Sequence, residues 1–287
     1  MKKILLAALM VVVLVGCATA PTSAPTLSPE PITTEEPAPV EAPAGMVYIP
    51  AGEFQMGCDP AHNGGFSCVT DSLPLHTVYL DAFFIDQYEV TNVQYAECVA
   101  ADGCKYPSRT NSATRESYFA NPEFDDYPVV FVAWADAAAY CTWAGKRLPT
   151  EAEWEKAARG SEVKAYPWGD GDPACTLANS FNNPDGSKCV GDTSAVGSFP
   201  EGSSVFGVAD MAGNVWEWVN DWYSESYYAE SPMENPVGFE GSSTRVLRGG
   251  GWASTWPQLL TASRTFDPDF HSSNDLGFRC AVSVTGE

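Results

Sequence analysis

The chain of 287 residues is strongly acidic, with 15 Lys and Arg against 37 Asp and Glu and a formal net charge of −22. Such a charge makes it a poor partner for nucleic acid phosphates, so no nucleic acid is expected among its ligands. Nine Trp, 24 Gly and 22 Pro with only 18% charged residues are unlike an ordinary helical enzyme and unlike a disordered chain. The composition predicts an aromatic-rich globule with many loops.

The first 16 residues have the order of features of an export signal. Lys2 and Lys3 precede an apolar run from Ile4 to Val15, which is too short for a membrane-spanning helix of about 20 residues. The Leu-Val-Gly-Cys sequence that ends at Cys17 resembles the bacterial lipobox, whose cysteine is acylated and becomes the new N-terminus. We therefore expect a lipoprotein anchored by Cys17 in the bacterial cell envelope, with palmitate among its acyl chains. The alternative is a plain secretory signal cut after Ala20.

Residues 17–44 have the composition of a tether. From Ala18 to Ala44 the sequence is rich in Pro, Ala, Thr and Glu, and it contains no aromatic residue, Lys or Arg. Such a segment cannot bury enough apolar surface to offset its conformational entropy. A Pro-rich segment of this length reaches up to about 80 Å from its anchor. The sequence thus predicts a folded, extracytoplasmic part over residues 45–287. Its lipid anchor can lie in an inner or an outer membrane.

The cysteines of residues 45–287 predict a disulfide framework. Nine Cys occur in the chain, and without Cys17 an even number of eight remains, as expected in an oxidising compartment. Eight cysteines allow 105 pairings, but three pairs are close in sequence and are separated by turn-forming residues. Elimination leaves the fourth pair, which closes the longest loop. The expected pairs are Cys58 with Cys68, Cys98 with Cys104, Cys175 with Cys189, and Cys141 with Cys280.

The first elements of the folded part are predicted to be strands. Residues 46–57 contain two β-rich runs around a Pro-Ala-Gly turn, and residues 76–88 indicate a further strand pair rich in Val, Tyr, Phe and Ile. Thr91 and Gln94 have the spacing of a capping box, so a helix is expected from there to about Ala101.

The next part of the chain is predicted to contain one more strand and two helices. Val129 to Val132 is predicted to be a buried strand that leads into an Ala-rich helix over residues 134–143, which Gly145 ends. Thr150 and Glu153 form a second capping box, and the following helix is expected to place Glu151 and Glu155 on its outer face. After Gly160 only turns and short strands are expected.

Several motifs of the chain occur in an order that is typical of one family. They are Gly145-Lys-Arg-Leu-Pro-Thr150, Tyr166-Pro-Trp-Gly169, Gly213-Asn-Val-Trp-Glu-Trp218, Arg245-Val-Leu-Arg-Gly-Gly-Gly-Trp252 and Asn274-Asp-Leu-Gly-Phe-Arg-Cys280. Together they resemble the formylglycine-generating enzyme, or sulfatase-modifying factor, family from Gly45 to Val284. The resemblance implies one α+β domain of irregular C-type-lectin-like fold with little regular secondary structure. It also supports the Cys141 to Cys280 disulfide, because family members bridge the corresponding positions.

The residues of these motifs favour a structural role when they are considered without the family. Trp154, Trp168, Trp216 and Trp218 are expected in the core, because an irregular fold depends on large apolar side chains. Arg147, Arg248, Arg264 and Arg279 are expected to hold carboxylates and loop carbonyls rather than substrate.

The family's oxidase chemistry is not expected in this chain. The enzymes of the family use oxygen and two cysteines, shortly after the glycine turn, that bind copper(I). Counting from the glycines places Ser254 at the first cysteine position and Trp256 or Leu259 at the second. Because a hydroxyl is a poor ligand for copper(I), we expect no copper. The leading hypothesis is a tethered binding module for a protein or glycan ligand. The rival hypothesis is a divergent enzyme that uses Ser254, Arg264 and nearby acids.

The family resemblance also implies a structural calcium site. The family binds Ca²⁺ through side chains and main-chain carbonyls that correspond to Asp210, Gly213, Val215 and Glu217, which are hard oxygen ligands. A second site is expected near Asn179, where the Cys175 to Cys189 loop departs from the family pattern. The alternative is that Glu217 pairs with an arginine and Asp210 caps a turn.

The stretch from Trp252 to Asp275 is the expected ligand surface. It follows a glycine run that permits close backbone approach, and it mixes aromatic with small polar residues. It is similar in position to the variable segment of the ligand-binding proteins of diversity-generating retroelements. The residues expected at this surface are Trp252, Ser254, Trp256, Arg264 and Phe270. The alternative is that the aromatic residues fill the core.

Overall fold

The structure is a computed structural model that describes residues 16, 41–182 and 186–284. The expected signal peptide, the lipidation site Cys17 and most of the tether lie outside the described residues. In the described part of the chain, no helix is long and apolar enough to cross a membrane.

The domain is α+β, as expected, and its strands form small sheets. A three-stranded antiparallel sheet has the order β1 (Met46–Ile49), β4 (Phe83–Asp86) and β11 (Ala281–Ser283). The strands β2 (Gly52–Met56) and β3 (His76–Leu80) form a separate antiparallel pair. The four strands at the N-terminus are therefore present, but β1 pairs with β4 instead of with β2, and β3 pairs with β2 instead of with β4.

A four-stranded sheet forms the centre of the domain and carries the site described below. Its order is β10 (Leu276–Phe278), β7 (Trp216–Trp222), β8 (Thr244–Arg248) and β9 (Arg264–Pro268). The pairing of β10 with β7 is parallel and the other pairings are antiparallel. The two-residue strands β5 (Phe181–Asn182) and β6 (Ser187–Lys188) form a hairpin.

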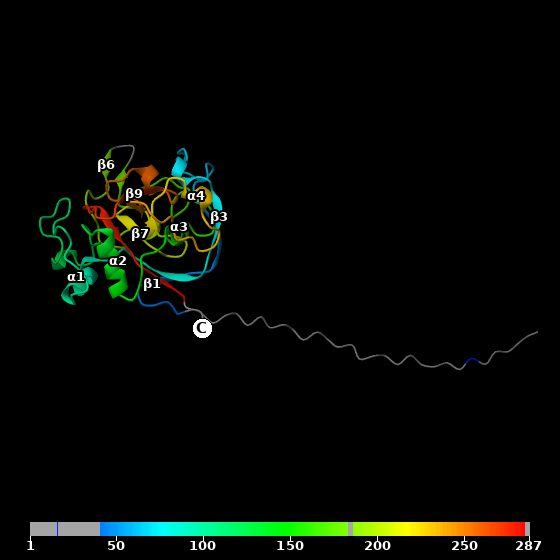
Figure 1. Cartoon of the computed structure of the whole chain (residues 1–287). Helices are drawn as coiled ribbons and strands as arrows, with labels where there is room; N and C mark the ends of the chain where they lie inside the picture. The colour runs from blue at the N-terminus through cyan, green and yellow to red at the C-terminus, as the bar shows by residue number, and fades with distance from the viewer. Residues whose placement is uncertain (1–15, 17–40, 183–185, 285–287) are drawn as a thin grey trace, which may run out of the picture. The chain divides into compact units, whose positions relative to one another are not determined.

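The helices are short, and the capping signals set the start of two of them. The helix α1 (Asn92–Ala100) begins at the capping box of Thr91, and α3 (Glu151–Arg159) begins at that of Thr150. The others are α2 (Trp134–Trp143) and α4 (Tyr227–Glu230), with 3₁₀ turns η1 (Thr70–Ser72), η2 (Pro122–Phe124), η3 (Pro200–Gly202) and η4 (Trp256–Leu259). Figure 1 shows α1 and α2 on one side of the domain and β3 and α4 on the other, with β7 and α3 between them.

Two large apolar clusters make up most of the core, on the two sides of β7. One includes Trp154 of α3 and Val219 of β7, and the other includes Trp218 of β7 and Phe278 of β10. Trp154 and Trp218 are fully buried and Trp216 is nearly so, which confirms that they pack in the core. The seven-residue strand β7 thus positions both clusters and the sheet edge that carries the site.

Two local expectations are wrong. Val129–Val132 is buried but lies outside every described strand, because Phe131 has a left-handed backbone (φ 60°) that ends the extended run. Glu151 and Glu155 lie in the core rather than on the outer face of α3, with 1% and 0% of their surface exposed. Glu151 is paired with Arg248 and Arg264 from distant segments, and Glu155 is paired with Arg248 and with Arg159 of the same helix.

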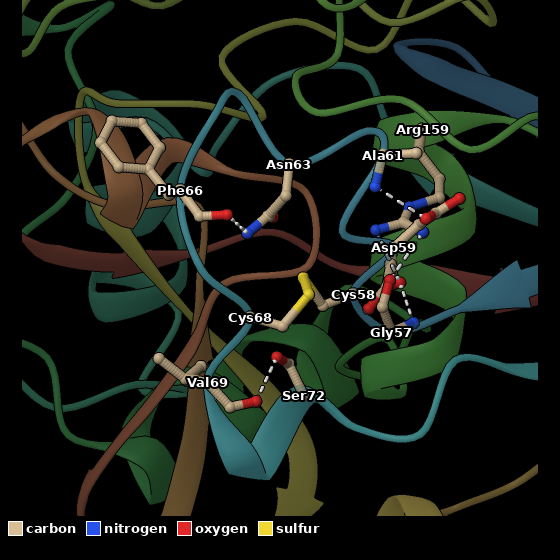
Figure 2. The surroundings of a disulfide bond; sticks show 11 residues. Gly57, Cys58, Asp59, Ala61, Asn63, Phe66, Cys68, Val69, Ser72 and Arg159 are labelled. Atoms are coloured by element: carbon tan, nitrogen blue, oxygen red, sulfur yellow. Dashed lines mark hydrogen bonds and ion pairs between the residues drawn. A yellow bond between two sulfur atoms is a disulfide. The ribbon is translucent and has the colours of Figure 1, made fainter.

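All four expected disulfides are present: Cys58–Cys68, Cys98–Cys104, Cys141–Cys280 and Cys175–Cys189. Cys141–Cys280 joins α2 to the residue before β11, across a sequence separation of 139. Figure 2 shows that Cys58–Cys68 closes a loop whose own hydrogen bonds also fix it, including Asn63 Nδ2 to the Phe66 carbonyl. The guanidinium of Arg159, at the end of α3, donates to the Gly57 carbonyl beside this disulfide.

Candidate functional site

A polar hollow of about 370 Å³ lies at the face of the four-stranded sheet. Its lining combines residues of β7, β8, β9 and β10 with η4 and the loop between β9 and β10. We call this cavity the β9 hollow. The residues whose polar groups matter below are Trp216, Gln258, Thr265, Asp267, His271 and Asp275.

The backbone around Asp275 holds one wall of the hollow in place. The Trp216 N–H donates to the Asp275 carbonyl oxygen at 2.7 Å, so the loop before β10 is fixed to the start of β7. A side chain at Gly251 would meet the Cβ and the carbonyl oxygen of Asp275, both 3.2 Å from the position of its Cβ. The glycine of the Gly249–Gly251 run therefore permits the close approach that the sequence indicated.

Two carboxylates dominate the charge of the β9 hollow. Asp267 lies 3.7 Å from His271 Nε2, with 37% of its side chain exposed, and Asp275 Oδ1 accepts a hydrogen bond of 2.6 Å from Ser273 Oγ. Partial burial raises the pKa of Asp267, His271 lowers it, and the nearby carboxylate of Asp275 raises it again. The lining therefore offers two acceptor groups that repel each other.

Aromatic rings stand exposed beside these carboxylates. Phe266 lines the hollow with 46% of its surface exposed, and it stacks on Tyr223 at a centroid distance of 4.1 Å. Phe270, in the loop between β9 and β10, is 80% exposed. An exposed large aromatic side chain in the loop that lines a polar hollow is typical of contact surfaces.

The expected ligand surface is only partly correct. Trp252, Ser254 and Arg264 are buried, with 7%, 4% and 6% exposure, so their expected place at the surface is wrong. Trp252 Nε1 donates to the Asn274 carbonyl, and the side chain of Trp256 packs half-buried against a small apolar cluster. Of the five residues, Phe270 is the one that is fully exposed.

Ser254 lacks the surroundings of a nucleophile. Its hydroxyl accepts a hydrogen bond of 2.9 Å from the Gly251 N–H, and no carboxylate or histidine among the described residues hydrogen-bonds to it. Arg264, its suggested partner in a divergent enzyme, directs its guanidinium to Glu151 instead. The two side chains therefore do not converge on a common reacting position.

A buried ionic cluster lies under β8 and β9 and sets their position. Arg264, the first residue of β9, donates to both carboxylate oxygens of Glu151 at 2.8 and 2.7 Å. Arg248, the last residue of β8, is paired with Glu151 and with Glu155. Tyr228 of α4 hydrogen-bonds to both carboxylates. This confirms the structural role that the sequence indicated for the arginines, and it ties the site to α3.

The segment expected to bind calcium holds an excess of buried negative charge. Glu89, Asp210 and Glu217 are all buried around Arg279, and Glu89 Oε2 has no hydrogen-bond partner in the described part of the chain. Burial raises the pKa of Asp210 and raises that of Glu89 strongly, and the Coulombic repulsion between the two carboxyls raises the pKa of Glu89 further. An orphaned carboxylate oxygen and this surplus of charge fit a bound cation.

The positions of the individual residues fit calcium less completely. Glu217 directs both oxygens to Arg279, at 2.7 and 2.8 Å, and one of them also accepts from Trp154 Nε1. Gly213 and Val215 flank Asn214 on the way into β7, and Asn179 Oδ1 is buried without a partner. In the described part of the chain, no three His, Cys, Asp or Glu side chains gather in a geometry that could hold a metal. The calcium site stays a prediction.

Most of the polar lining falls within the stretch from Trp252 to Asp275 that was the expected ligand surface. Trp216 was expected only as a core residue, and Thr265, Asp267 and His271 were not named individually as ligand-surface residues. The alternating residues of β9 contained a usable signal, since Arg264 and Phe266 point to different surroundings from Thr265 and Asp267. This alternation indicates a polar site only when the segments that pack beside β9 are known.

The comparisons with known proteins agree with the motifs. Residues 32–284 match the family described as Sulfatase-modifying factor enzyme 1-like domain. A formylglycine-generating enzyme from Streptomyces coelicolor is 36% identical over 306 residues, which cover 88% of this chain and 95% of that protein. The serine/threonine-protein kinase Pkn1 of Chlamydia trachomatis is also 36% identical, over 90% of this chain but only 40% of that protein.

Solved structures of similar fold extend this result. The structure of PvdO from Pseudomonas aeruginosa has a TM-score of 0.69 at 30% identity, with 83% of this chain and 94% of that chain covered. Treponema denticola variable protein 1 shares the fold, with a TM-score of 0.65 at 24% identity over 83% of this chain and 95% of that chain. The motifs, the disulfide framework and these matches together establish that this chain belongs to the sulfatase-modifying factor enzyme 1-like domain family.

Proposed function

We propose that this protein is a binding module of its family that does not oxidise cysteine, and that it recognises its ligand at the β9 hollow. The observation that carries the proposal is the state of the cysteines. All eight cysteines of the described domain are joined in four disulfides. The described domain therefore offers no pair of free thiols, which are the ligands that suit copper(I).

The segment after the glycine run supports the same proposal. Ser254 stands where the family resemblance places the first catalytic cysteine, and neither candidate for the second position is a cysteine. The hydroxyl of Ser254 is buried and accepts a backbone hydrogen bond, so it has neither the softness nor the exposure that copper chemistry requires.

The β9 hollow supports binding because it is open and polar, and the loop that lines it also carries the exposed ring of Phe270. Its size, about 370 Å³, suits one amino-acid side chain with adjoining backbone or one sugar unit. Ion pairs of Arg248 and Arg264 with Glu151 hold β8 and β9, so the hollow is preorganised by its scaffold. A second hollow of about 400 Å³ contains Arg147, but this guanidinium is already bound to Glu153, Leu148 and Ser283.

The proposal places the domain outside the cytoplasm on a lipid anchor at Cys17, with membrane lipid as its first partner and a structural Ca²⁺ near Asp210. Four disulfides support an oxidising compartment. The buried carboxylates of Glu89 and Asp210 support a cation at the start of the segment that leads into β7.

The experiment that tests the proposal compares oxidation directly. The purified chain and the formylglycine-generating enzyme of Streptomyces coelicolor are each incubated with copper(I), oxygen and a cysteine peptide that the latter enzyme converts. Mass spectrometry then measures formylglycine in the peptide. We expect product with the Streptomyces enzyme and none with this chain. Formation of formylglycine by this chain with all of its disulfides intact would refute the proposed function.

A further inference from the structure

The chemistry of the β9 hollow is specific enough to indicate the class of its ligand. The lining contains two carboxylates, Asp267 and Asp275, and the single ionisable base His271 among its described residues. Arg264 lies at the start of the same strand but is paired with Glu151 under the sheet. The charge that a ligand meets in the hollow is therefore negative, and the chain as a whole adds to it with a net charge of −22.

A second, independent feature is an unused hydrogen-bond donor. Trp216 lines the hollow and is nine-tenths buried, with 9% exposure, and its indole N–H has no partner among the described residues. The other buried tryptophans, Trp154, Trp218 and Trp252, each donate their indole N–H to a protein oxygen. Solvent reaches this N–H, so a ligand in the hollow can replace the water there with an acceptor oxygen of its own.

Further donors stand beside the indole. The side-chain oxygen of Gln258 accepts from Thr255, and the NH₂ group of Gln258 has no hydrogen-bond partner among the residues that the structure describes. The hollow thus needs a ligand that brings an acceptor oxygen for the donors and a positive charge for the carboxylates. A Lys or Arg residue within a polypeptide brings both, as a backbone carbonyl and a cationic side chain. A free polyamine brings the charge alone.

The mutual repulsion of the two carboxylates favours the same ligand. Binding of a cation near Asp267 and Asp275 relieves the repulsion that helps to raise the pKa of Asp267.

We propose that the β9 hollow binds the cationic side chain, Lys or Arg, of a polypeptide ligand. This inference rests on the proposed binding function and adds the chemical class of the partner. In the complex, Asp267 and Asp275 contact the ammonium or guanidinium group, and the Trp216 indole and the Gln258 amide donate to the backbone carbonyl of the same residue.

The test uses the indole of Trp216 as a reporter in the full chain, purified in detergent and labelled with ¹⁵N at its nine tryptophans. The Trp216→Phe variant identifies the signal that belongs to this residue. The probes are the Nα-acetyl methylamides of lysine, arginine, norleucine and glutamate, together with spermidine. We expect the lysine and arginine amides to shift the Trp216 signal at concentrations at least about fivefold lower than the norleucine amide.

The variants Asp267→Asn and Asp275→Asn should each lower the affinity for the lysine amide by at least about fivefold, which corresponds to roughly 1 kcal/mol of binding free energy. Asp269→Asn, in the same loop but outside the lining, is the matched control and should leave the affinity unchanged. The remaining indole signals report whether each variant is folded.

Equal shifts with the norleucine or glutamate amide would overturn the inference about charge, while a binding function at the hollow would stand. Shifts with spermidine as strong as those with the lysine amide would overturn the assignment to a polypeptide. No shift with any amide would overturn the inference as a whole, and the oxidation assay would then decide the proposed function by itself.

Discussion

Replacement of Glu151 by Gln tests whether the buried ionic cluster supports the site. The Glu151 carboxylate is 1% exposed and accepts from Arg264 at 2.8 and 2.7 Å, from Arg248 at 3.2 Å and from Tyr228 at 3.2 Å. A Gln keeps the shape but removes the charge, so among the described residues Arg248 keeps Glu155 as an ion-pair partner and Arg264 keeps none. Breaking a buried ion pair on one side costs about 3–5 kcal/mol.

That loss is large against the 5–15 kcal/mol stability that is typical of a folded domain. Urea unfolding, followed by tryptophan fluorescence with the disulfides intact, should therefore show a strongly lowered midpoint for Glu151→Gln. The matched control is Glu162→Gln. Glu162 pairs with Lys164 at 3.3 Å but is 78% exposed, so its loss should cost less than about 1 kcal/mol. If Glu151→Gln is destabilised by no more than the control, the cluster does not hold β8 and β9 as we argue.

Three further predictions concern the disulfides, calcium and the anchor. Replacing Cys141 and Cys280 by Ser should lower the unfolding free energy by about 5 kcal/mol, against about 3 kcal/mol for the disulfide that closes a separation of 14, and the reverse order in urea unfolding would contradict the loop-closure reasoning. Excess Ca²⁺ should raise the melting temperature over that in chelator, and Asp210→Asn should reduce the difference; equal melting of the unaltered protein in both solutions would argue against the site. Cys17→Ser should move the protein from the membrane to the soluble fraction, and the idea fails if the variant stays with the membrane while the unaltered protein carries no acyl mass.

Local signals in the sequence were sufficient for two helix starts and for three of the disulfides, and the fourth disulfide followed by elimination. The capping boxes at Thr91 and Thr150 depend on residues three positions apart, so the sequence contains all of the information that they need. The burial of Glu151 depends instead on Arg248 and Arg264, which reach it only in the folded sheet.

The candidate site was harder to predict for the same reason. Trp216, Gln258 and Asp275 come from three segments, and only the parallel pairing of β10 with β7 brings them to one hollow. The left-handed backbone of Phe131 is a further example, since nothing in a run of β-branched and aromatic residues indicates a positive φ.

The position of the last two strands has a consequence for how the domain is completed. The strand β10 pairs with β7, and β11 pairs with β4 near the start of the domain, while Cys280 between them joins α2. During synthesis, which starts at the N-terminus, β7 lacks its partner β10 and β4 lacks its partner β11 until these last strands have been made. Contacts between such distant segments make folding slow. An early stop codon near residue 275 would thus remove a partner from both sheets at once, so the domain should not fold without its last two strands.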